Sequence, residues 1–344
     1  MGTLKRILGC LAVLAVVTAT AAPAQTAPLK VFCTLPDLGS LSRSIGGDQV
    51  DVSVMIKGGE DPHFIEAKPS FIKQLSEANL FIQNGMDLEA GYVPLLLQNA
   101  RNDRVLPGNT GYLDVSTAIA AMEVPSVSVD RSMGDVHPFG NPHYLLDPVN
   151  GLRAAAAIRD KLADLRPEQR SRFEQDFVAF KARLDAALVG AALATKYDAS
   201  KLAVLFERGK LDAFLQQQGD AAQLGGWLAA LQPHHGTKFV DDHNIWPYFA
   251  RRFGLELLGH LEPKPGVPPT TSHLTAIIEQ MRSSKTRLIL AAPYYDPRHA
   301  RFVAEQTGAR IASLAHIVGA RPGTDDYLRM IDYNVGQLAA ALAP

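Results

Sequence analysis

The sequence has almost no net charge and very little cysteine. Its 34 Lys and Arg residues balance 35 Asp and Glu residues, which leaves a formal net charge of −1. A chain so balanced has no general attraction to nucleic acid or to an anionic membrane, so neither is an expected partner. The 344 residues are 47% hydrophobic, which is enough for one large or two medium domains with their own cores.

The first residues contain no apolar run long enough to cross a membrane. A basic pair, Lys5-Arg6, precedes a short apolar segment over 7–17, and Ala22-Pro23-Ala24 has the small-x-small pattern of a cleavage site. We therefore predict a cleavable signal peptide over 1–24 and a soluble periplasmic protein. Cys10 follows a Leu-Gly pair and offers lipid attachment as the alternative, but most of the apolar segment comes after it.

After cleavage near Ala24, the chain retains one cysteine, Cys33. An exported protein with a single cysteine has no internal disulfide, so its stability must come from its core. Cys33 lies in an apolar run, and we expect it to be a small buried residue.

Short strands and helices alternate on both sides of the middle of the chain, which favours parallel α/β sheets. The patterns predict strands over 29–35, 50–56, 80–83, 202–206, 238–240, 255–258, 287–291 and 309–314. They predict helices over 38–45, 70–78, 89–100, 274–282, 298–306 and 327–342.

One long helix is expected between these two halves, over about 168–194. Its apolar stripe recurs at steps of three and four residues and includes Phe173, Phe177, Phe180, Leu184 and Leu188. We predict two α/β lobes, each with a mostly parallel sheet, joined by this spine helix. The predicted boundaries are 25–165 for the N-terminal lobe, 166–196 for the linking helix and 197–344 for the C-terminal lobe. A long helix packed inside a single core is the alternative.

Three histidines follow predicted strands or lie in the loops beyond them: His63 in EDPH, His143 in NPHY and His243 in DDHN. Ligand sites of open α/β sheets gather beyond the carboxyl ends of strands. Neutral imidazole is also the usual nitrogen ligand of zinc. Each histidine taken alone is more often a surface or hydrogen-bonded side chain, so a metal site requires the fold to bring them together.

The sequence around these histidines resembles the zinc- and manganese-binding receptors of bacterial ABC importers, the ZnuA/TroA-like family. The resemblance covers nearly all of the mature chain and includes the run HNIWPYFARRFGLELLGHLEPKPGVPP that begins at His243. It implies that His63, His143 and His243 are metal ligands and that Asp61 and Asp147 are turn, cap or ring-orienting residues. It also implies that the protein delivers the metal to an ABC permease. We expect the protein to be a monomer, and loading of the site by a metallochaperone stays open.

The fourth ligand is where the sequence departs from that family. The family commonly has an Asp near the end of the chain, in a segment resembling Leu-x-Asp-x-x-Gly, and the matching residue here is His316. Asp296, in APYYDPRH, and a water molecule are the alternatives. A shell of four imidazoles would favour zinc over manganese, because nitrogen donors suit zinc and carboxylates suit manganese.

Two other functions compete with metal capture. A zinc hydrolase needs an open coordination position and a nearby general base, and the sequence has no HExxH motif; we therefore predict that the protein is not an enzyme. A receptor for an organic ligand or a metal chelate would instead need an apolar, aromatic cleft. The sequence also has no long His- and acid-rich loop. Among its further histidines, we interpret His137 as a solvated loop residue, with metal delivery as the alternative.

Overall fold

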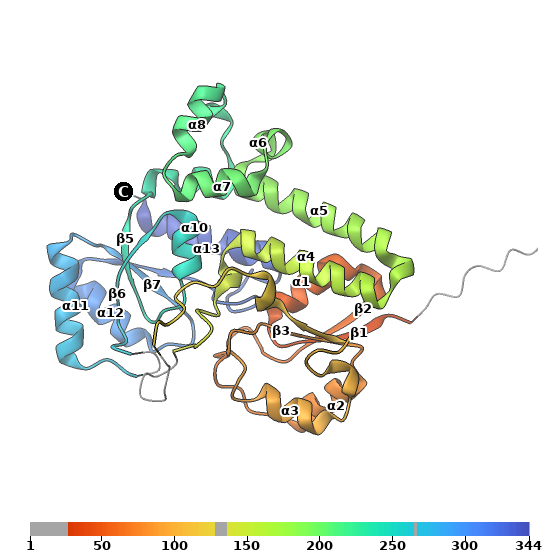
Figure 1. Ribbon diagram of the computed structural model, residues 1–344. Coiled ribbons are helices and arrows are strands. Elements are labelled where there is room, and N and C mark those ends of the chain that lie inside the picture. Colours follow the sequence, from red (N-terminus) through yellow and green to blue (C-terminus); the bar gives the residue numbers. More distant parts are fainter. Residues whose placement is uncertain (1–26, 128–135, 265–266, 344) are drawn as a thin grey trace, which may run out of the picture.

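The computed structural model describes residues 27–127, 136–264 and 267–343, and these form two α/β lobes side by side (Figure 1). The predicted signal peptide and Cys10 lie outside the described residues. No helix in the described ranges is long and apolar enough to cross a membrane. The predicted class of two parallel-sheet lobes is confirmed.

The N-terminal lobe contains a four-stranded parallel sheet in the order β2-β1-β3-β4. Its strands are β1 (Leu29–Cys33), β2 (Val50–Val54), β3 (Leu80–Gln83) and β4 (Tyr112–Asp114). Its helices are α1 (Pro36–Gly46), α2 (Pro69–Glu77) and α3 (Val93–Ala100). Cys33 is fully buried at the end of β1, as predicted for a small core residue.

The C-terminal lobe repeats this topology, with a parallel sheet in the order β6-β5-β7-β8. Its strands are β5 (Lys238–Asp241), β6 (Glu256–His260), β7 (Leu288–Ala291) and β8 (Arg310–Ser313). Its helices are α10 (Pro247–Phe253), α11 (Thr271–Ser283), α12 (Pro297–Thr307) and α13 (Tyr327–Leu342). Loops beyond the carboxyl ends of both sheets therefore carry the histidines singled out in the sequence.

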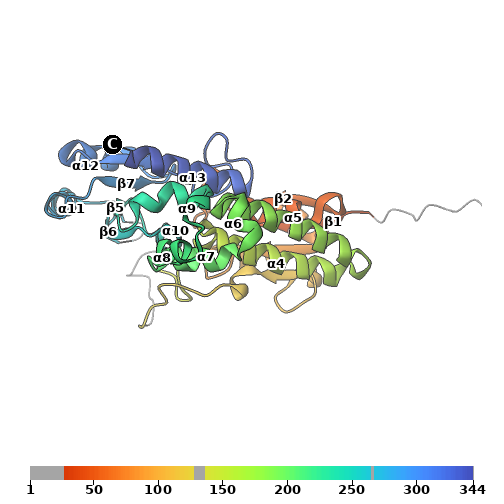
Figure 2. The ribbon, with the colours of Figure 1, turned by 90° about the horizontal axis from the view of Figure 1, so that it is seen from above.

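A run of helices connects the lobes, and Figure 2 shows α4 and α5 lying along one another. These helices are α4 (Pro148–Leu165), α5 (Arg170–Val189), α6 (Ala191–Lys196), α7 (Ala199–Glu207), α8 (Leu211–Gln218) and α9 (Gly226–Leu231). Single 3-10 turns lie at η1 (Gly47–Gln49), η2 (Asp103–Val105), η3 (Val115–Ala118), η5 (Tyr144–Leu146), η6 (Pro167–Gln169), η7 (Ala221–Gln223) and η8 (Gln232–His234).

The joining helix is shorter than the sequence pattern predicts. It is the 20-residue α5, about 30 Å long at 1.5 Å per residue, and it ends at Val189 instead of continuing to 194. The stop is Gly190, which has a positive φ of 85°. A Cβ on Gly190 would also lie only 2.8 Å from the Cα of Gly225, so another residue would be strained there in two ways.

The predicted strand over 202–206 is wrong, because this segment is part of helix α7. Asp198 caps the helix by accepting a hydrogen bond from the backbone N–H of Lys201. The buried side chains Ala199, Leu202, Ala203 and Phe206 then recur at helical spacing. A short apolar run does not by itself distinguish a strand from a buried helix, and here the cap and the three- and four-residue steps decide it.

The helix predicted over 89–100 begins later, at Val93. Glu89 is buried, and its carboxylate accepts hydrogen bonds from the backbone N–H groups of Asn84 and Gly85 and from the hydroxyl of Thr34. Residues 85–87 all have positive φ, so a tight turn replaces the first helical turn.

Several polar contacts hold the lobes against each other. Asp147 caps α4 and also forms a buried, two-bond ion pair with Arg252 of α10, at 2.8 and 2.9 Å. The hydroxyl of Tyr327 donates to the backbone carbonyl of Leu145, and the backbone N–H of Val318 donates to the carboxylate of Asp37. Arg251 also approaches Asp147, and Glu207 also pairs with Arg252, so the buried pair belongs to a larger ionic network.

Candidate metal centre

His63 lies in the loop that follows β2, and a neighbouring carboxylate fixes its ring. Asp61 Oδ1 accepts hydrogen bonds from the backbone N–H of His63 at 3.0 Å and from its ring Nδ1 at 2.8 Å. Burial acts to raise the pKa of Asp61, but the hydrogen bonds and the ring of His63 outweigh it and hold this pKa below its ordinary value. Since a carboxylate only accepts, Nδ1 carries the proton, and Nε2 is left unprotonated with a lone pair that could bind a metal ion.

His143 repeats this arrangement in the loop before α4. Asn141 Oδ1 accepts from the backbone N–H and from Nδ1 of His143, both at 3.0 Å. The Nδ2 group of Asn141 donates to the carbonyl of Asn244, which belongs to the other lobe. Burial, together with the nearby His63, His243, His137 and His316, lowers the pKa of His143 well below its usual value. The ring is therefore neutral at pH 7, as a metal ligand must be.

His243 enters the site from the C-terminal lobe, in the loop after β5. Its Nδ1 lies 2.9 Å from Oε2 of Glu262, a residue just beyond the end of β6. The ring of His243 stacks on Tyr295, with centroids 5.7 Å apart. Glu262, 19 residues away in the sequence, thus orients the ring of His243 as Asp61 and Asn141 orient the rings of the other two histidines.

His316 follows β8 and is held from the opposite lobe. Its Nε2 lies 3.1 Å from the backbone carbonyl of Glu60, so in this ring Nε2 carries the proton and Nδ1 is the available nitrogen. Gly58 allows this approach, since a Cβ there would lie 2.1 Å from the carbonyl carbon of Gly319. Burial lowers the pKa of His316 to about 4, and its ring packs against the edge of Tyr294 with centroids 4.6 Å apart.

The structure brings His63, His143 and His243 into mutual contact from two lobes. Their ring centroids are 5.3 Å apart for His63 and His143, 6.0 Å for His63 and His243, and 6.3 Å for His143 and His243. Two imidazoles bound tetrahedrally to zinc at about 2.0–2.1 Å would hold their centroids about 5 Å apart. The three rings are therefore at or slightly beyond the spacing that a shared metal ion requires.

Four histidine ring nitrogens in this region are buried without a hydrogen-bond partner in the described part of the chain. His63 Nε2, His143 Nε2, His137 Nε2 and His316 Nδ1 are each buried and have no hydrogen-bond partner among the described residues. Buried polar atoms normally have partners, so each such atom calls for an explanation, such as an ion. Within the described ranges, no group of three or more His, Cys, Asp or Glu side chains already has the geometry of a metal site.

Asp296, the rival fourth donor, is engaged elsewhere. It caps α12 by accepting from the backbone N–H of Arg298 and also pairs with the guanidinium of Arg298. This pairing holds the pKa of Asp296 well below its ordinary range. The other two carboxylates singled out in the sequence have the expected supporting roles: Asp61 orients His63, and Asp147 caps α4.

His137 is the residue whose interpretation from sequence fails. It is not a solvated loop side chain: its ring stacks on His63 with centroids 5.2 Å apart, and its Nε2 is buried. Glu262 was also missed, because a single carboxylate after a strand carries no sequence signal. Asn141 could have been found, since it stands two residues before His143 just as Asp61 stands two residues before His63.

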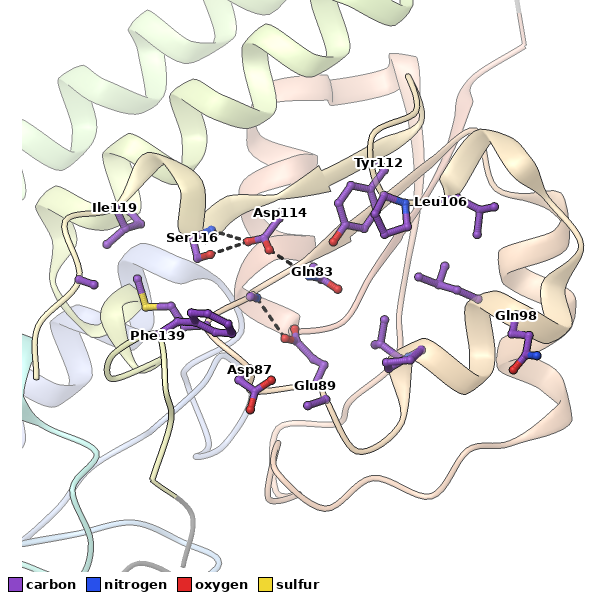
Figure 3. Close-up of a pocket in the computed structure, with 18 residues that line it drawn as sticks. Gln83, Asp87, Glu89, Gln98, Leu106, Tyr112, Asp114, Ser116, Ile119 and Phe139 are labelled. Carbon is purple, nitrogen blue, oxygen red and sulfur yellow. Dashed lines mark hydrogen bonds between the residues drawn. The ribbon is translucent and has the colours of Figure 1, made fainter. Parts of the chain in front are cut away.

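A larger cavity, of about 790 Å³, lies on the N-terminal lobe away from the histidines (Figure 3). Its walls are mainly apolar and include Leu97, Leu106 and Phe139. The polar groups that line it are bonded to each other: Asp114 accepts from Ser116 and Gln83, and Glu89 accepts from the backbone (Figure 3). Because a specific organic-ligand site needs polar groups that point at the ligand, this cavity gives the organic-receptor alternative little support.

The fold and the histidine cluster define a two-lobed binding protein whose candidate site lies between the lobes. A family model described as "Zinc-uptake complex component A periplasmic", ZnuA, matches residues 31–201 and 214–341. The chain belongs to this family of substrate-binding components of metal ABC transporters.

Among its relatives, the high-affinity zinc uptake system protein ZnuA of Yersinia pestis is 24% identical over 88% of this chain and 87% of that protein. The manganese ABC transporter substrate-binding lipoprotein PsaA of Streptococcus mitis is 22% identical over 92% of this chain and 89% of that protein. A crystal structure of ZnuA has a TM-score of 0.66 with 22% identity, over 92% of this chain and all of that one. The likeness to that structure shows a shared fold.

Proposed function

We propose that this protein captures one zinc ion between its lobes, outside the inner membrane, and delivers it to an ABC permease. The proposed ligands are Nε2 of His63, His143 and His243 and Nδ1 of His316. Relatives named for zinc and for manganese both exist, so the choice of metal depends on the donors present in this chain. Four imidazole nitrogens favour zinc, because manganese prefers oxygen donors.

The observation that supports the proposal is that the two nitrogens of an imidazole ring have different surroundings. One nitrogen is held by an oxygen acceptor, namely Asp61, Asn141, Glu262 or the carbonyl of Glu60. In His63, His143 and His316 the other nitrogen is buried without a partner among the described residues. Metal-bound histidines nearly always donate their second N–H to such an oxygen, which fixes the ring and raises its basicity.

A full shell of four imidazoles also argues against hydrolytic chemistry. A catalytic zinc keeps a position open for water and needs a general base beside it. The carboxylates closest to these rings, Asp61 and Glu262, already accept hydrogen bonds from the rings that they orient. This arrangement supports a site that holds and releases a metal over one that activates water.

The test is metal analysis of the purified mature protein, stripped of metal and reloaded. One equivalent of zinc should bind per chain, and zinc a thousandfold above its Kd should add about 4 kcal/mol to the free energy of unfolding. An unchanged melting curve with saturating zinc, after verified metal removal, would contradict a tight site in the folded protein.

The export of the protein has its own test. We propose cleavage near Ala24 and release into the periplasm, with lipid attachment at Cys10 as the alternative; both positions precede the described residues. The intact mass of the exported protein separates the two. A mass that begins at Gln25 supports a free periplasmic protein, and a lipidated chain beginning at Cys10 would replace it with a membrane-anchored one.

A further inference from the structure

Asp37 is a buried acidic residue at the contact between the two lobes. It lies in the first turn of α1, shortly after β1, and only 1% of its surface is exposed. Its Oδ2 accepts a hydrogen bond of 3.1 Å from the backbone N–H of Val318, which belongs to the C-terminal lobe. Its Oδ1 is also buried and has no hydrogen-bond partner in the described part of the chain. A carboxyl group in such surroundings is costly to bury, so its presence at this contact calls for an explanation.

Val318 belongs to the His316 loop, residues 314–319, which follows β8. The backbone of Ala315, one residue before His316, is bonded to Asn334 of α13: its N–H donates to Oδ1 at 2.7 Å, and its carbonyl accepts from Nδ2 at 2.8 Å. Asn334 is fully buried in the C-terminal lobe. Two buried side chains therefore hold the backbone on either side of His316, Asn334 from its own lobe and Asp37 from the opposite lobe.

The two N-terminal histidines receive both kinds of support from one residue. Asp61 and Asn141 each accept a hydrogen bond from the ring and another from the backbone N–H of the histidine two residues later. For His316 the ring acceptor is the carbonyl of Glu60, so its backbone must be held by other groups. Asp37 supplies that support from the same lobe as Glu60, and the ring and the loop are thus both anchored on the N-terminal lobe.

We propose that Asp37 is a positioning residue of the metal centre, which holds the His316 loop against the N-terminal lobe so that Nδ1 of His316 reaches the ion. This rests on the proposed function. Donor atoms of a metal site must stay within about 0.5 Å of the productive geometry, so a loosened loop would weaken the bond from His316 before the other three. The competing role is purely structural, because an acidic residue in the first turn of a helix also stabilises that helix.

Ser40 provides a matched control on the same helix. It lies one turn after Asp37, and its hydroxyl accepts a hydrogen bond of 2.9 Å from the backbone N–H of Tyr327, the first residue of α13. Both residues thus accept one backbone N–H from the opposite lobe, but Tyr327 lies outside the His316 loop. A general contribution to the lobe contact predicts the same outcome at both positions, whereas positioning of His316 predicts an effect at Asp37 only.

The first experiment measures zinc affinity in a double-mutant cycle. Asp37→Ala should raise the Kd about tenfold, the lower end of what an orienting partner contributes. In the His316→Ala background the same change should alter the Kd less than about twofold, because the loop then carries no ligand. Ser40→Ala should also stay within about twofold of wild type. Equal losses from Asp37→Ala in both backgrounds, or an equal loss in Ser40→Ala, would overturn the proposal.

The second experiment uses Asp37→Asn, which keeps an oxygen acceptor for the N–H of Val318. Burial raises the pKa of Asp37 to about 7, so its neutral form, which Asn resembles, is well populated at neutral pH. Zinc affinity should therefore stay within about threefold of wild type. A loss of about tenfold in Asp37→Asn would overturn the proposal, whether or not Asp37→Ala folds. Circular dichroism and melting of each metal-free variant check the fold at the assay temperature.

The third measurement reads the ligand shell directly. Cobalt(II) replaces zinc as the probe, because its visible ligand-field bands depend on the donors that surround it. The bands of Asp37→Ala should shift toward those of His316→Ala, and the bands of Asp37→Asn and Ser40→Ala should match those of wild type. A wild-type spectrum for Asp37→Ala would overturn the proposal.

The two levels of the account fail separately. If wild type binds one zinc ion and Asp37→Ala binds it as tightly, the role of Asp37 is wrong and the four-ligand site stands. If His316→Ala binds zinc as tightly as wild type, His316 is not a ligand and the role of Asp37 falls with it. If wild type takes up neither cobalt nor zinc, the proposed function itself is wrong.

Discussion

The two lobes share one sheet order but orient their histidines in different ways. In the N-terminal lobe, the acceptor for each ring stands two residues earlier in the same loop: Asp61 for His63 and Asn141 for His143. In the C-terminal lobe, the acceptor for His243 is Glu262, from another strand end, and the acceptor for His316 is the carbonyl of Glu60, from the other lobe. One half of the site is built locally, and the other half depends on tertiary structure.

The difference has a consequence for how the site responds to change. A local acceptor also fixes the backbone, because Asp61 and Asn141 each accept the N–H of their histidine. The rings of His63 and His143 should therefore keep their orientation even when the two lobes shift relative to each other. The position of His316 depends on the approach of Gly58 and Glu60 to the loop that contains Gly319, so it should respond to any shift between lobes.

The largest effect is expected from the preorganised half. The double substitution His63→Ala and His143→Ala removes both locally oriented rings. The Kd for zinc should rise at least about a thousandfold, because two of the four proposed nitrogen donors are lost. The fold should remain, since neither ring is part of the apolar core. Titration calorimetry with circular dichroism checks this. Retention of one tightly bound equivalent would show that the histidines were misassigned.

Removal of the orienting residues should cost less and should differ between lobes. Asn141→Ala and Glu262→Ala each release one ring, and such second partners typically contribute 10–100-fold to metal affinity. We expect Asn141→Ala to give the larger loss because it also frees the backbone of the loop at His143. Zinc affinities measured beside those of Asp51→Ala, an exposed change on β2, provide the comparison. Equal and negligible losses would mean that the rings are fixed by packing alone.

The buried ring of His316 predicts a pH-dependent stability in the metal-free protein. Burial lowers its folded pKa to about 4, whereas an unfolded histidine titrates near 6.5. Between about pH 6.5 and 4 the unfolded chain therefore binds a proton that the folded chain does not, and stability falls as pH falls. Replacing His316 by Asn should flatten this slope and remove about 1–3 kcal/mol of the loss. Chemical denaturation at several pH values measures it, and parallel curves for the two proteins would be the contrary result.

The smallest effects concern metal choice at the fourth position. His316→Asp exchanges a nitrogen for a harder oxygen donor, so zinc should weaken and manganese should gain relative to it, by about tenfold in the ratio of affinities. Asp296→Asn is the matched control and should change zinc affinity less than about twofold, since that carboxylate pairs with Arg298. Competition titrations of both metals decide the point. A strong loss in Asp296→Asn with none in His316→Asp would transfer the fourth place to Asp296.

The parts of the molecule that could be predicted from sequence are those set by local pattern. The alternation of apolar runs predicts both parallel sheets, and the DPH and NPH segments mark two of the candidate ligand loops. The strand predicted over 202–206 failed because an apolar run of that length fits a strand or a buried helix, and the cap at Asp198 decides between them. The predicted length of the helix was wrong because α5 ends at Gly190. The close approach of Gly225 to Gly190 is a tertiary contact, which the sequence pattern does not show.

The site shows the same limit. Neither the stacking of His137 on His63 nor the pairing of Glu262 with His243 follows from spacing, because each joins segments from different strand ends. His316 became a candidate ligand only through the resemblance of its segment to a family pattern. The division of the chain at 25–165, 166–196 and 197–344 stays a prediction; limited proteolysis of the metal-free protein would test where the lobes separate.

The central claim is that one zinc ion is held by imidazoles from both lobes. Its most direct test is anomalous diffraction at the zinc edge from crystals of the zinc-loaded protein. The account predicts a single strong peak about 2.0–2.1 Å from Nε2 of His63, His143 and His243 and from Nδ1 of His316. A peak bound by residues of only one lobe, or one located away from these four rings, would contradict it.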